Sequence, residues 1–194
     1  MTFAAGAALA FALVACNRAD DTANVDVSAN DMLANDMNAM TDNAAVNGVG
    51  VAPMAAVDFA NTVAASDAFE IESGKLAEQK STTAAVKDFA KMIQTDHKKS
   101  TEELKAAAAK AQPAITPSPA LTAEQQGNLD KLKAASGADF DKLFADQQIA
   151  AHQKALDALS AYAAGGDVPV LREFAGKVVP VVQSHLDKAR ALQH

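Results

Sequence analysis

The sequence predicts an all-α protein built around a four-helix bundle. Nearly half of its 194 residues are apolar, alanine dominates that fraction, and aromatic residues make up only 5%. This composition suits closely packed helices better than a sheet, because strands favour β-branched and aromatic side chains. Four long stretches after residue 56 repeat apolar residues with the 3.6-residue period of a helix that buries one face.

Residues 1–15 have the features of a bacterial lipoprotein signal peptide. The run MTFAAGAALAFALVA is too short to span a membrane and ends at Cys16, the only cysteine in the chain. The four residues LVAC resemble a lipobox, in which the cysteine becomes the lipidated first residue, although no Lys or Arg precedes the run. The alternative is a structural or redox cysteine, which would have no second cysteine to pair with. Lipidation at Cys16 predicts an anchor that faces the periplasm. Asn17, rather than Asp, follows the cysteine, and by resemblance to sorted enterobacterial lipoproteins this favours the outer membrane.

Residues 16–56 are expected to form a disordered, acidic tether between this anchor and a folded domain at 57–194. The segment is rich in Asn, Asp and Ala, and six aspartates against Arg18 give it a net charge of −5 out of −7 for the whole chain. Such a composition cannot bury enough apolar surface to offset the entropy of ordering. The acidic balance lies mostly in the tether and indicates no nucleic-acid partner.

The first two predicted helices, residues 57–80 and 83–111, each turn an ionisable group inward. Glu70 lies on the apolar stripe of the first helix, whereas Asp67 falls outside that stripe. His97 lies on the apolar stripe of the second helix, and Asp96 lies at its edge. A buried polar group needs a partner, because leaving it unpaired costs roughly 1–3 kcal/mol.

A proline-rich connection and a short helix precede the third long helix. The segment PAITPSPA at 113–120 cannot continue a helix. Thr122 and Gln125 match a capping box that opens a short helix ending near Gly137. The third long helix is predicted over residues 138–164, and its buried side carries three polar residues: Asp141, Gln148 and His152.

The fourth long helix follows a glycine pair and is predicted to run from about residue 167 to residue 192. Asp167 is a candidate N-cap, and Pro169 falls in the first turn, where proline is tolerated. Pro180 lies within the helix and is expected to kink it. His185 lies at the centre of the apolar stripe.

Each of the four long helices therefore carries one central inward ionisable group, namely Glu70, His97, His152 and His185. Helical bundles build metal sites from such inward side chains, which predicts a carboxylate-and-histidine metal site. The alternative is that the histidines are separate core residues, each hydrogen-bonded to a neighbour such as Tyr162, Gln148, Asp96 or Asp141. The sequence leaves both alternatives open.

Four segments of the chain resemble the helical blocks of a bacterial family, domain of unknown function 4142: FEIESGKLAEQKS, VKDFAKMIQTDHKKSTEEL, FDKLFADQQIAAHQKAL and LREFAGKVVPVVQSHLDKARAL. The resemblance covers residues 57–192, and its most specific elements are TDH, AHQKA and P-x4-H. It implies an envelope-located, ferritin-like bundle of unestablished activity, often labelled as an outer-membrane protein. The family's recurrent residues fall, in this sequence, at Glu70, Asp96, His97, Asp141, His152, Pro180 and His185. Lipidation explains the membrane label better than a spanning segment, because no later segment is apolar for long enough.

The residues argue against the di-iron site that a ferritin-like fold suggests. A di-iron carboxylate site needs two glutamates and two Glu-x-x-His motifs, and Gln94, Ile149 and Val182 stand three residues before the histidines. One glutamate with three histidines suits Zn(II), Cu(II) or Ni(II) better. Counted from the turns that join the helices, the four groups spread over about 12 Å. Two or three ligands with water are therefore expected, with Asp96 or Asp141 as further candidates.

Two classes of function follow from these observations. The first is a lipid-anchored envelope protein whose bundle binds a transition metal, Zn or Cu, for buffering or stress protection. The second is a structural or interaction module whose histidines are packed core residues. An enzyme ranks third, since the sequence shows no glycine-rich phosphate loop, no cofactor motif and no other nucleophile with a base at recognisable spacing.

Overall fold

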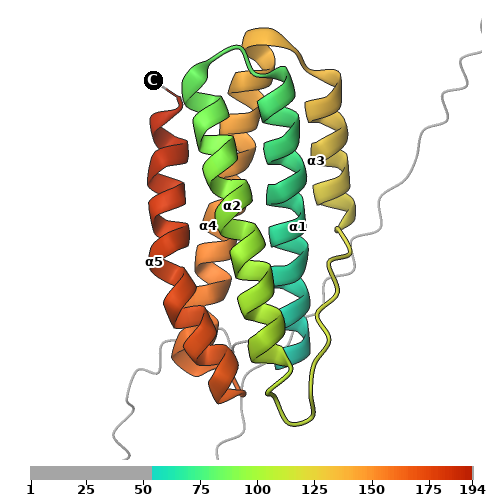
Figure 1. Cartoon of the computed structure of the whole chain (residues 1–194), viewed down its shortest axis with the longest axis vertical. Coiled ribbons are helices and arrows are strands. Elements are labelled where there is room, and N and C mark those ends of the chain that lie inside the picture. The colour runs from blue at the N-terminus through green and yellow to red at the C-terminus, as the bar shows by residue number, and fades with distance from the viewer. Residues whose placement is uncertain (1–53, 194) are drawn as a thin grey trace, which may run out of the picture. The chain divides into compact units, whose positions relative to one another are not determined.

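The computed structural model of the chain describes residues 54–193, and its regular secondary structure over that range consists of α-helices (Figure 1). The predicted signal peptide, Cys16 and almost all of the predicted tether lie outside the described residues. The helices are α1 (Ala56–Lys80), α2 (Ala84–Ala108), α3 (Ala123–Ala134), α4 (Gly137–Gly165) and α5 (Pro169–Ala191). The prediction of an all-α four-helix bundle with an extra short helix in the second connection is confirmed.

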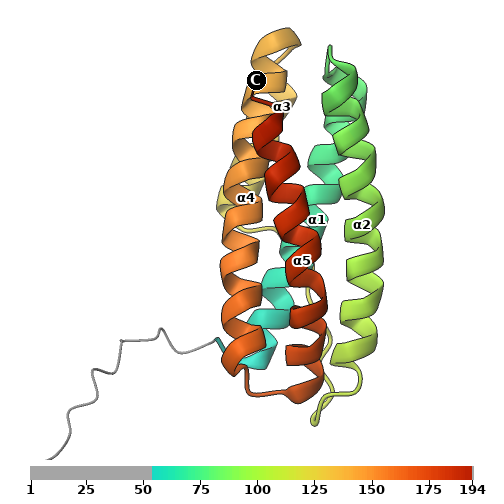
Figure 2. The same cartoon turned by 90° about the vertical axis from the view of Figure 1, so that its left-hand side faces the viewer.

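The chain forms two helical hairpins joined by one long crossover. Helices α1 and α2 are antiparallel neighbours, and so are α4 and α5 (Figures 1 and 2). The connection after α2 runs back along the bundle through α3, so α4 runs parallel to α2 (Figure 1). Helix α3 packs on α1 and α4 outside the four-helix core. A single long crossover is the connectivity of ferritin-like bundles.

Local signals at the helix ends explain most of the boundaries. Thr122 Oγ1 accepts a hydrogen bond from the backbone N–H of Gln125 at 3.2 Å, and Gln125 Oε1 accepts one from the backbone N–H of Thr122 at 2.9 Å. The predicted capping box of α3 therefore forms. The prediction that Asp167 caps α5 is wrong: Val168 is the N-cap, and Asp167 accepts a hydrogen bond from the Tyr162 hydroxyl at 2.7 Å. Pro180 lies inside α5, which is bent in Figure 1.

The interior consists of two apolar clusters with a polar layer between them. One cluster joins the start of α1 to the end of α4, where the rings of Phe59 and Tyr162 stack with centroids 3.8 Å apart. The other joins the end of α1 to the start of α4 and includes Phe89 and Phe144. On every long helix the buried polar residues fall between these two clusters in the sequence, and they include Asp67 and Glu70, His97, His152, and His185. The hydrophobic interior of the bundle is thus interrupted by a polar layer near its middle.

None of the helices between residues 54 and 193 combines the length and hydrophobicity that crossing a membrane requires.

Candidate metal centre

Three histidines from three helices converge in the polar layer. His97 comes from α2, His152 from α4 and His185 from α5, and each is at most 5% exposed. Their ring centroids lie 5.4–5.6 Å apart. One nitrogen from each ring lies within 4.8 Å of the corresponding nitrogens of the other two. The structure therefore brings together the three histidines that the sequence placed inside the bundle.

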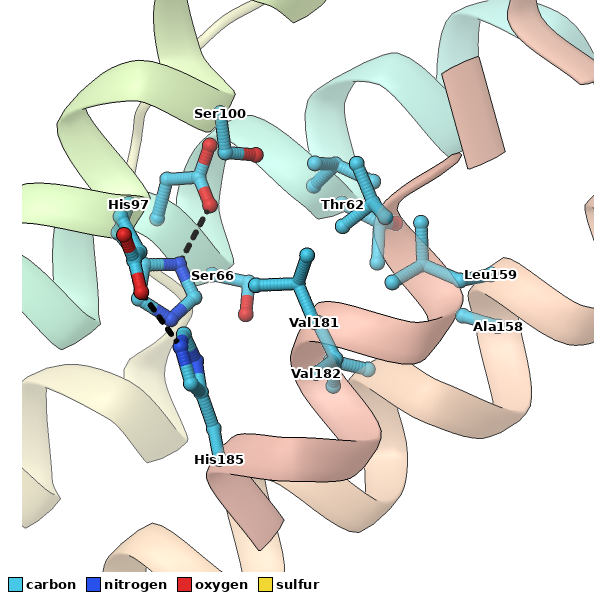
Figure 3. Close-up of a pocket in the computed structure, with 14 residues that line it drawn as sticks. Thr62, Ser66, His97, Ser100, Ala158, Leu159, Val181, Val182 and His185 are labelled. Carbon is cyan, nitrogen blue, oxygen red and sulfur yellow. Dashed lines mark hydrogen bonds and ion pairs between the residues drawn. The ribbon is translucent and has the colours of Figure 1, made fainter. Parts of the chain in front are cut away.

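Each imidazole uses one ring nitrogen in a hydrogen bond that fixes its orientation. His97 Nδ1 lies 2.8 Å from Asp67 Oδ1, and His185 Nε2 lies 2.9 Å from Asp96 Oδ2 (dashed lines in Figure 3). His152 Nδ1 lies 2.8 Å from the backbone carbonyl oxygen of Gln148. Since these partners can only accept, the N–H of each ring points at its partner. The ring orientations and tautomers are set by groups outside the histidine cluster.

The remaining nitrogen of each ring is buried without a partner. Among the described residues, nothing hydrogen-bonds to Nε2 of His97, Nε2 of His152 or Nδ1 of His185. Each of these nitrogens carries a lone pair when its ring is neutral. Histidine ligands in metal sites use this arrangement, with one nitrogen on the metal and the other donating to a carboxylate or carbonyl.

The spacing of the ring nitrogens of the three histidines is close to what one metal ion needs. Zn–N bonds of 2.0–2.1 Å in a tetrahedral site put ligand nitrogens about 3.3 Å apart. The limit of 4.8 Å among the histidine nitrogens exceeds this value by about 1.5 Å. Three protein ligands leave a fourth position open. The three buried histidines could therefore hold a metal ion with one free coordination position.

Burial and neighbouring charges give the three histidine rings different pKa values. Burial, together with the charge of His97, lowers the pKa of His152 to about 3. Burial also lowers the pKa of His185, although its hydrogen bond to Asp96 opposes the change. Burial acts in the same direction on His97, but the hydrogen bond and charge of Asp67 outweigh it and raise the pKa of His97 above its usual 6.5. His152 and His185 are thus neutral at neutral pH and available as ligands, and His97 is the ring that competes for a proton.

Glu70 lies beside the cluster without joining the three nitrogens. Its Oε1 is 3.9 Å from Nδ1 of His152, and its side chain is 1% exposed. Within the part of the chain that the structure describes, neither carboxylate oxygen of Glu70 has a hydrogen-bond partner. Burial raises the pKa of Glu70 to about 7. This predicted ligand therefore stands next to the centre as a carboxyl that takes up or releases a proton near neutral pH.

The two aspartates predicted as further ligands have different positions. Asp96 lies next to the histidines and accepts a hydrogen bond from His185, so it orients this ring and does not add a fourth ligand. Asp141 is not brought to the centre: its Oδ2 accepts hydrogen bonds from Thr82 at the α1–α2 turn, from the backbone N–H at 3.2 Å and from Oγ1 at 2.8 Å. Eleven residues separate Asp141 from His152, which is about 16 Å along a helix. Placing Asp141 at the centre was therefore wrong.

The role of Asp67 was not predicted from the sequence, because its position falls outside the apolar stripe of the first helix. It is 2% exposed, and besides His97 it accepts a hydrogen bond from Thr101 Oγ1 at 3.2 Å. The available signal was its position three residues before Glu70, since residues three apart share one helix face. Gln148 was correctly placed inside, and its backbone carbonyl group accepts the hydrogen bond that orients His152. Tyr162, considered as a histidine partner, bonds to Asp167 instead.

Comparison with solved structures identifies proteins of the same fold. The chain is similar to "CopM in the Cu(II)-bound form", with a TM-score of 0.61 and 19% sequence identity over 72% of this chain and 95% of that chain. It is also similar to "CopM in the Cu(I)-bound form", with a TM-score of 0.59 and 18% identity over 71% of this chain and 94% of that one. A search of curated proteins gives no match.

The sequence itself matches a family over most of its length. The match covers residues 39–192 and includes the three histidines, Glu70 and both aspartates that orient the rings. It confirms the resemblance inferred from the helical blocks. The chain belongs to the family described as Domain of unknown function (DUF4142).

Proposed function

We propose that this protein is a lipid-anchored envelope protein whose bundle binds one transition metal ion through His97, His152 and His185. Copper is the first candidate and zinc is the competing ion. One observation carries the proposal: three buried imidazoles from different helices bring one ring nitrogen each within 4.8 Å of the others, and each ring has one nitrogen without a hydrogen-bond partner. This satisfies the ligand and outer-shell requirements of a histidine metal site.

Packing alone is a weaker explanation of the same residues. A core histidine is tolerated when both ring nitrogens find partners, because each unpartnered buried group costs roughly 1–3 kcal/mol. In this bundle each ring satisfies one nitrogen and leaves the other buried and free, and this occurs at three neighbouring rings. Three independent packing compromises would not need to fall on neighbouring rings. A shared ion satisfies all three nitrogens at once.

The donor set favours copper or zinc over the harder metals. Imidazole nitrogens suit Zn, Cu and Ni, whereas iron pairs in bundles are bridged by carboxylates. Asp67 and Asp96 are both engaged with ring N–H groups, which leaves Glu70 as the only uncommitted carboxyl beside the cluster among residues 54–193. Two structures with the same fold were solved with Cu(I) and Cu(II) bound, which supports copper as the first candidate.

Metal titration tests the proposal on the full chain carrying Cys16→Ser, because this substitution removes a thiol that would itself bind copper. Zn(II) at about 100 times its dissociation constant should stabilise the protein by about 2.7 kcal/mol. For a domain of this size the melting temperature should then rise by roughly 5–10 °C. His97→Ala and His185→Ala should each remove the rise and one equivalent of bound metal. His194→Ala is the matched control and should keep both.

Two results of this titration would contradict the proposal. If the Cys16→Ser chain shows no rise with Zn(II), Cu(II) or Cu(I), the histidines are packing residues. If His97→Ala and His194→Ala lose the same amount of metal, the ion is bound elsewhere in the chain.

The envelope location rests on the lipobox-like residues that end at Cys16. An anchored bundle with a copper or zinc site would buffer metal ions at the periplasmic surface and so protect against metal stress. The location is tested by fractionating cells that express the parent and Cys16→Ser chains. The parent should sediment with membranes and the variant should be released. Unchanged fractionation would remove the anchor from the proposal.

A further inference from the structure

A small pocket lies against the histidine centre. It has a volume of about 40 Å³, and residues of α1, α2, α4 and α5 line it. His97 and His185 lie on one side of it, and Thr62, Ala158 and Leu159 lie on the opposite side (Figure 3). His152 does not line the pocket. Two of the three candidate ligands are therefore reachable from this space.

Most of the pocket wall is aliphatic, and it also holds a buried hydroxyl without a hydrogen-bond partner. Val178, Val181 and Val182 of α5 line it together with alanine and leucine side chains of α4. Ser100 also lines it and is only 9% exposed. No group among the described residues hydrogen-bonds to the Ser100 hydroxyl. A buried hydroxyl facing a small apolar space can donate to a ligand that enters that space.

Size and charge limit what can enter. A water molecule needs roughly 10–15 Å³ of such volume, so this pocket has room for about three water-sized atoms. The carboxylates of Asp67 and Asp96 also line the pocket and already supply negative charge beside the rings. With Cu(I) bound by three neutral imidazoles, the local charge would be negative. An anion would be repelled there and would lose its hydration against aliphatic walls.

We propose that the pocket admits an uncharged diatomic molecule, of the class of carbon monoxide and dioxygen, to the open coordination position of the metal. This inference rests on the proposed function, because the ligand binds to an ion held by the three histidines. The diatomic molecule occupies the aliphatic space with one atom on copper, and the Ser100 hydroxyl donates to it. Val181 is 41% exposed and also lines the pocket, so the pocket reaches the surface beside it.

Carbon monoxide bound to Cu(I) tests the proposal by infrared spectroscopy. The Cys16→Ser chain is loaded anaerobically, and uptake of Cu(I) at the three histidines is measured first. Exposure to carbon monoxide should then give one C–O stretching band with one molecule per copper. Ala158→Phe fills the pocket and should weaken carbon monoxide binding at least tenfold while Cu(I) uptake remains. Ala161→Phe, on the exposed side of the same helix, is the matched control and should leave the band unchanged.

Ser100→Ala provides a second variant with no added volume. It should keep the carbon monoxide stoichiometry and shift the C–O band, because the donated hydrogen bond is lost. A parent protein that takes up Cu(I) but shows no C–O band would overturn the pocket proposal and leave the metal site intact. A band that Ala158→Phe and Ser100→Ala both leave unchanged would place the ligand elsewhere. Failure to take up Cu(I) at the histidines would overturn the proposed function and this inference with it.

Discussion

The buried carboxyl of Glu70 leads to a quantitative prediction about folding stability. Burial raises the pKa of Glu70 from 4.5 to about 7. A raised carboxyl pKa stabilises the folded state fully below pH 4.5, and this contribution is lost as the pH rises through about 7. One pKa unit corresponds to about 1.4 kcal/mol, so the full contribution is about 3 kcal/mol. Between pH 5 and pH 8 the parent should lose about 2.5 kcal/mol of stability through this group.

Glu70→Gln keeps the size of the side chain and removes its ionisation. The new amide can donate to Gln148 Oε1, which is buried and has no hydrogen-bond partner within residues 54–193. Relative to the parent, the variant should therefore gain about 2.5 kcal/mol of unfolding free energy between pH 5 and pH 8. Urea unfolding followed by circular dichroism, in the presence of a chelator, measures this difference at both pH values.

Glu72→Gln is the matched control for this measurement. Glu72 lies on the exposed side of the same helix, where its Oε1 pairs with Lys75 Nζ at 2.6 Å. An exposed pair of this kind contributes at most about 1 kcal/mol, so the control should follow the pH profile of the parent closely. If Glu70→Gln also followed the parent profile, the carboxyl would ionise in the folded protein at an ordinary pH. That result would refute the argument from burial.

Three further predictions concern the histidines. Metal affinity should fall about tenfold per pH unit below the raised pKa of His97, because a proton then competes for this ligand, and chelator competition at several pH values measures the fall. His152→Leu should abolish metal binding. In urea unfolding without metal, the variant should be as stable as the parent or about 1 kcal/mol more stable, because it lacks a buried unpartnered nitrogen. A large loss of unfolding free energy would indicate that His152 is a packing residue. Asp96→Asn should weaken metal binding about 10–100-fold by loosening its hold on His185, whereas the exposed Asp88→Asn should not.

The long helices could be predicted from the sequence because each keeps a 3.6-residue apolar period over many turns. Their boundaries were less certain: α2 ends at Ala108, three residues before the predicted end. The apolar stripes also gave wrong positions for two aspartates: Asp67 was predicted outside the buried face, and Asp141 was predicted at the centre. A helix stripe says which side faces the bundle, but it does not say what lies opposite at each level. At the level of Asp141 the neighbour is the α1–α2 turn, where Thr82 donates two hydrogen bonds to Oδ2 of this carboxylate.

The expected spread of the ligands along the bundle shows why connectivity matters. Distances were counted from the α1–α2 turn for Glu70 and His97, and from the α4–α5 turn for His152 and His185. Figure 1 shows that the long crossover puts these two turns at opposite ends of the bundle. Counts from opposite ends cannot be compared as heights, so the estimated spread of about 12 Å did not apply. The three histidines meet because the crossover makes α2 and α4 parallel.

The position of the cluster also determines what a bound ion does to the fold. Each hairpin, α1 with α2 and α4 with α5, packs more extensively within itself than against the other (Figure 2). His97 belongs to the first hairpin, whereas His152 and His185 belong to the second. An ion on all three would therefore tie together the two hairpins, in the layer where buried polar groups replace apolar packing. Because the ligands come together only when the hairpins are docked, metal affinity and docking of the hairpins are coupled, and the ion stabilises that interface in particular.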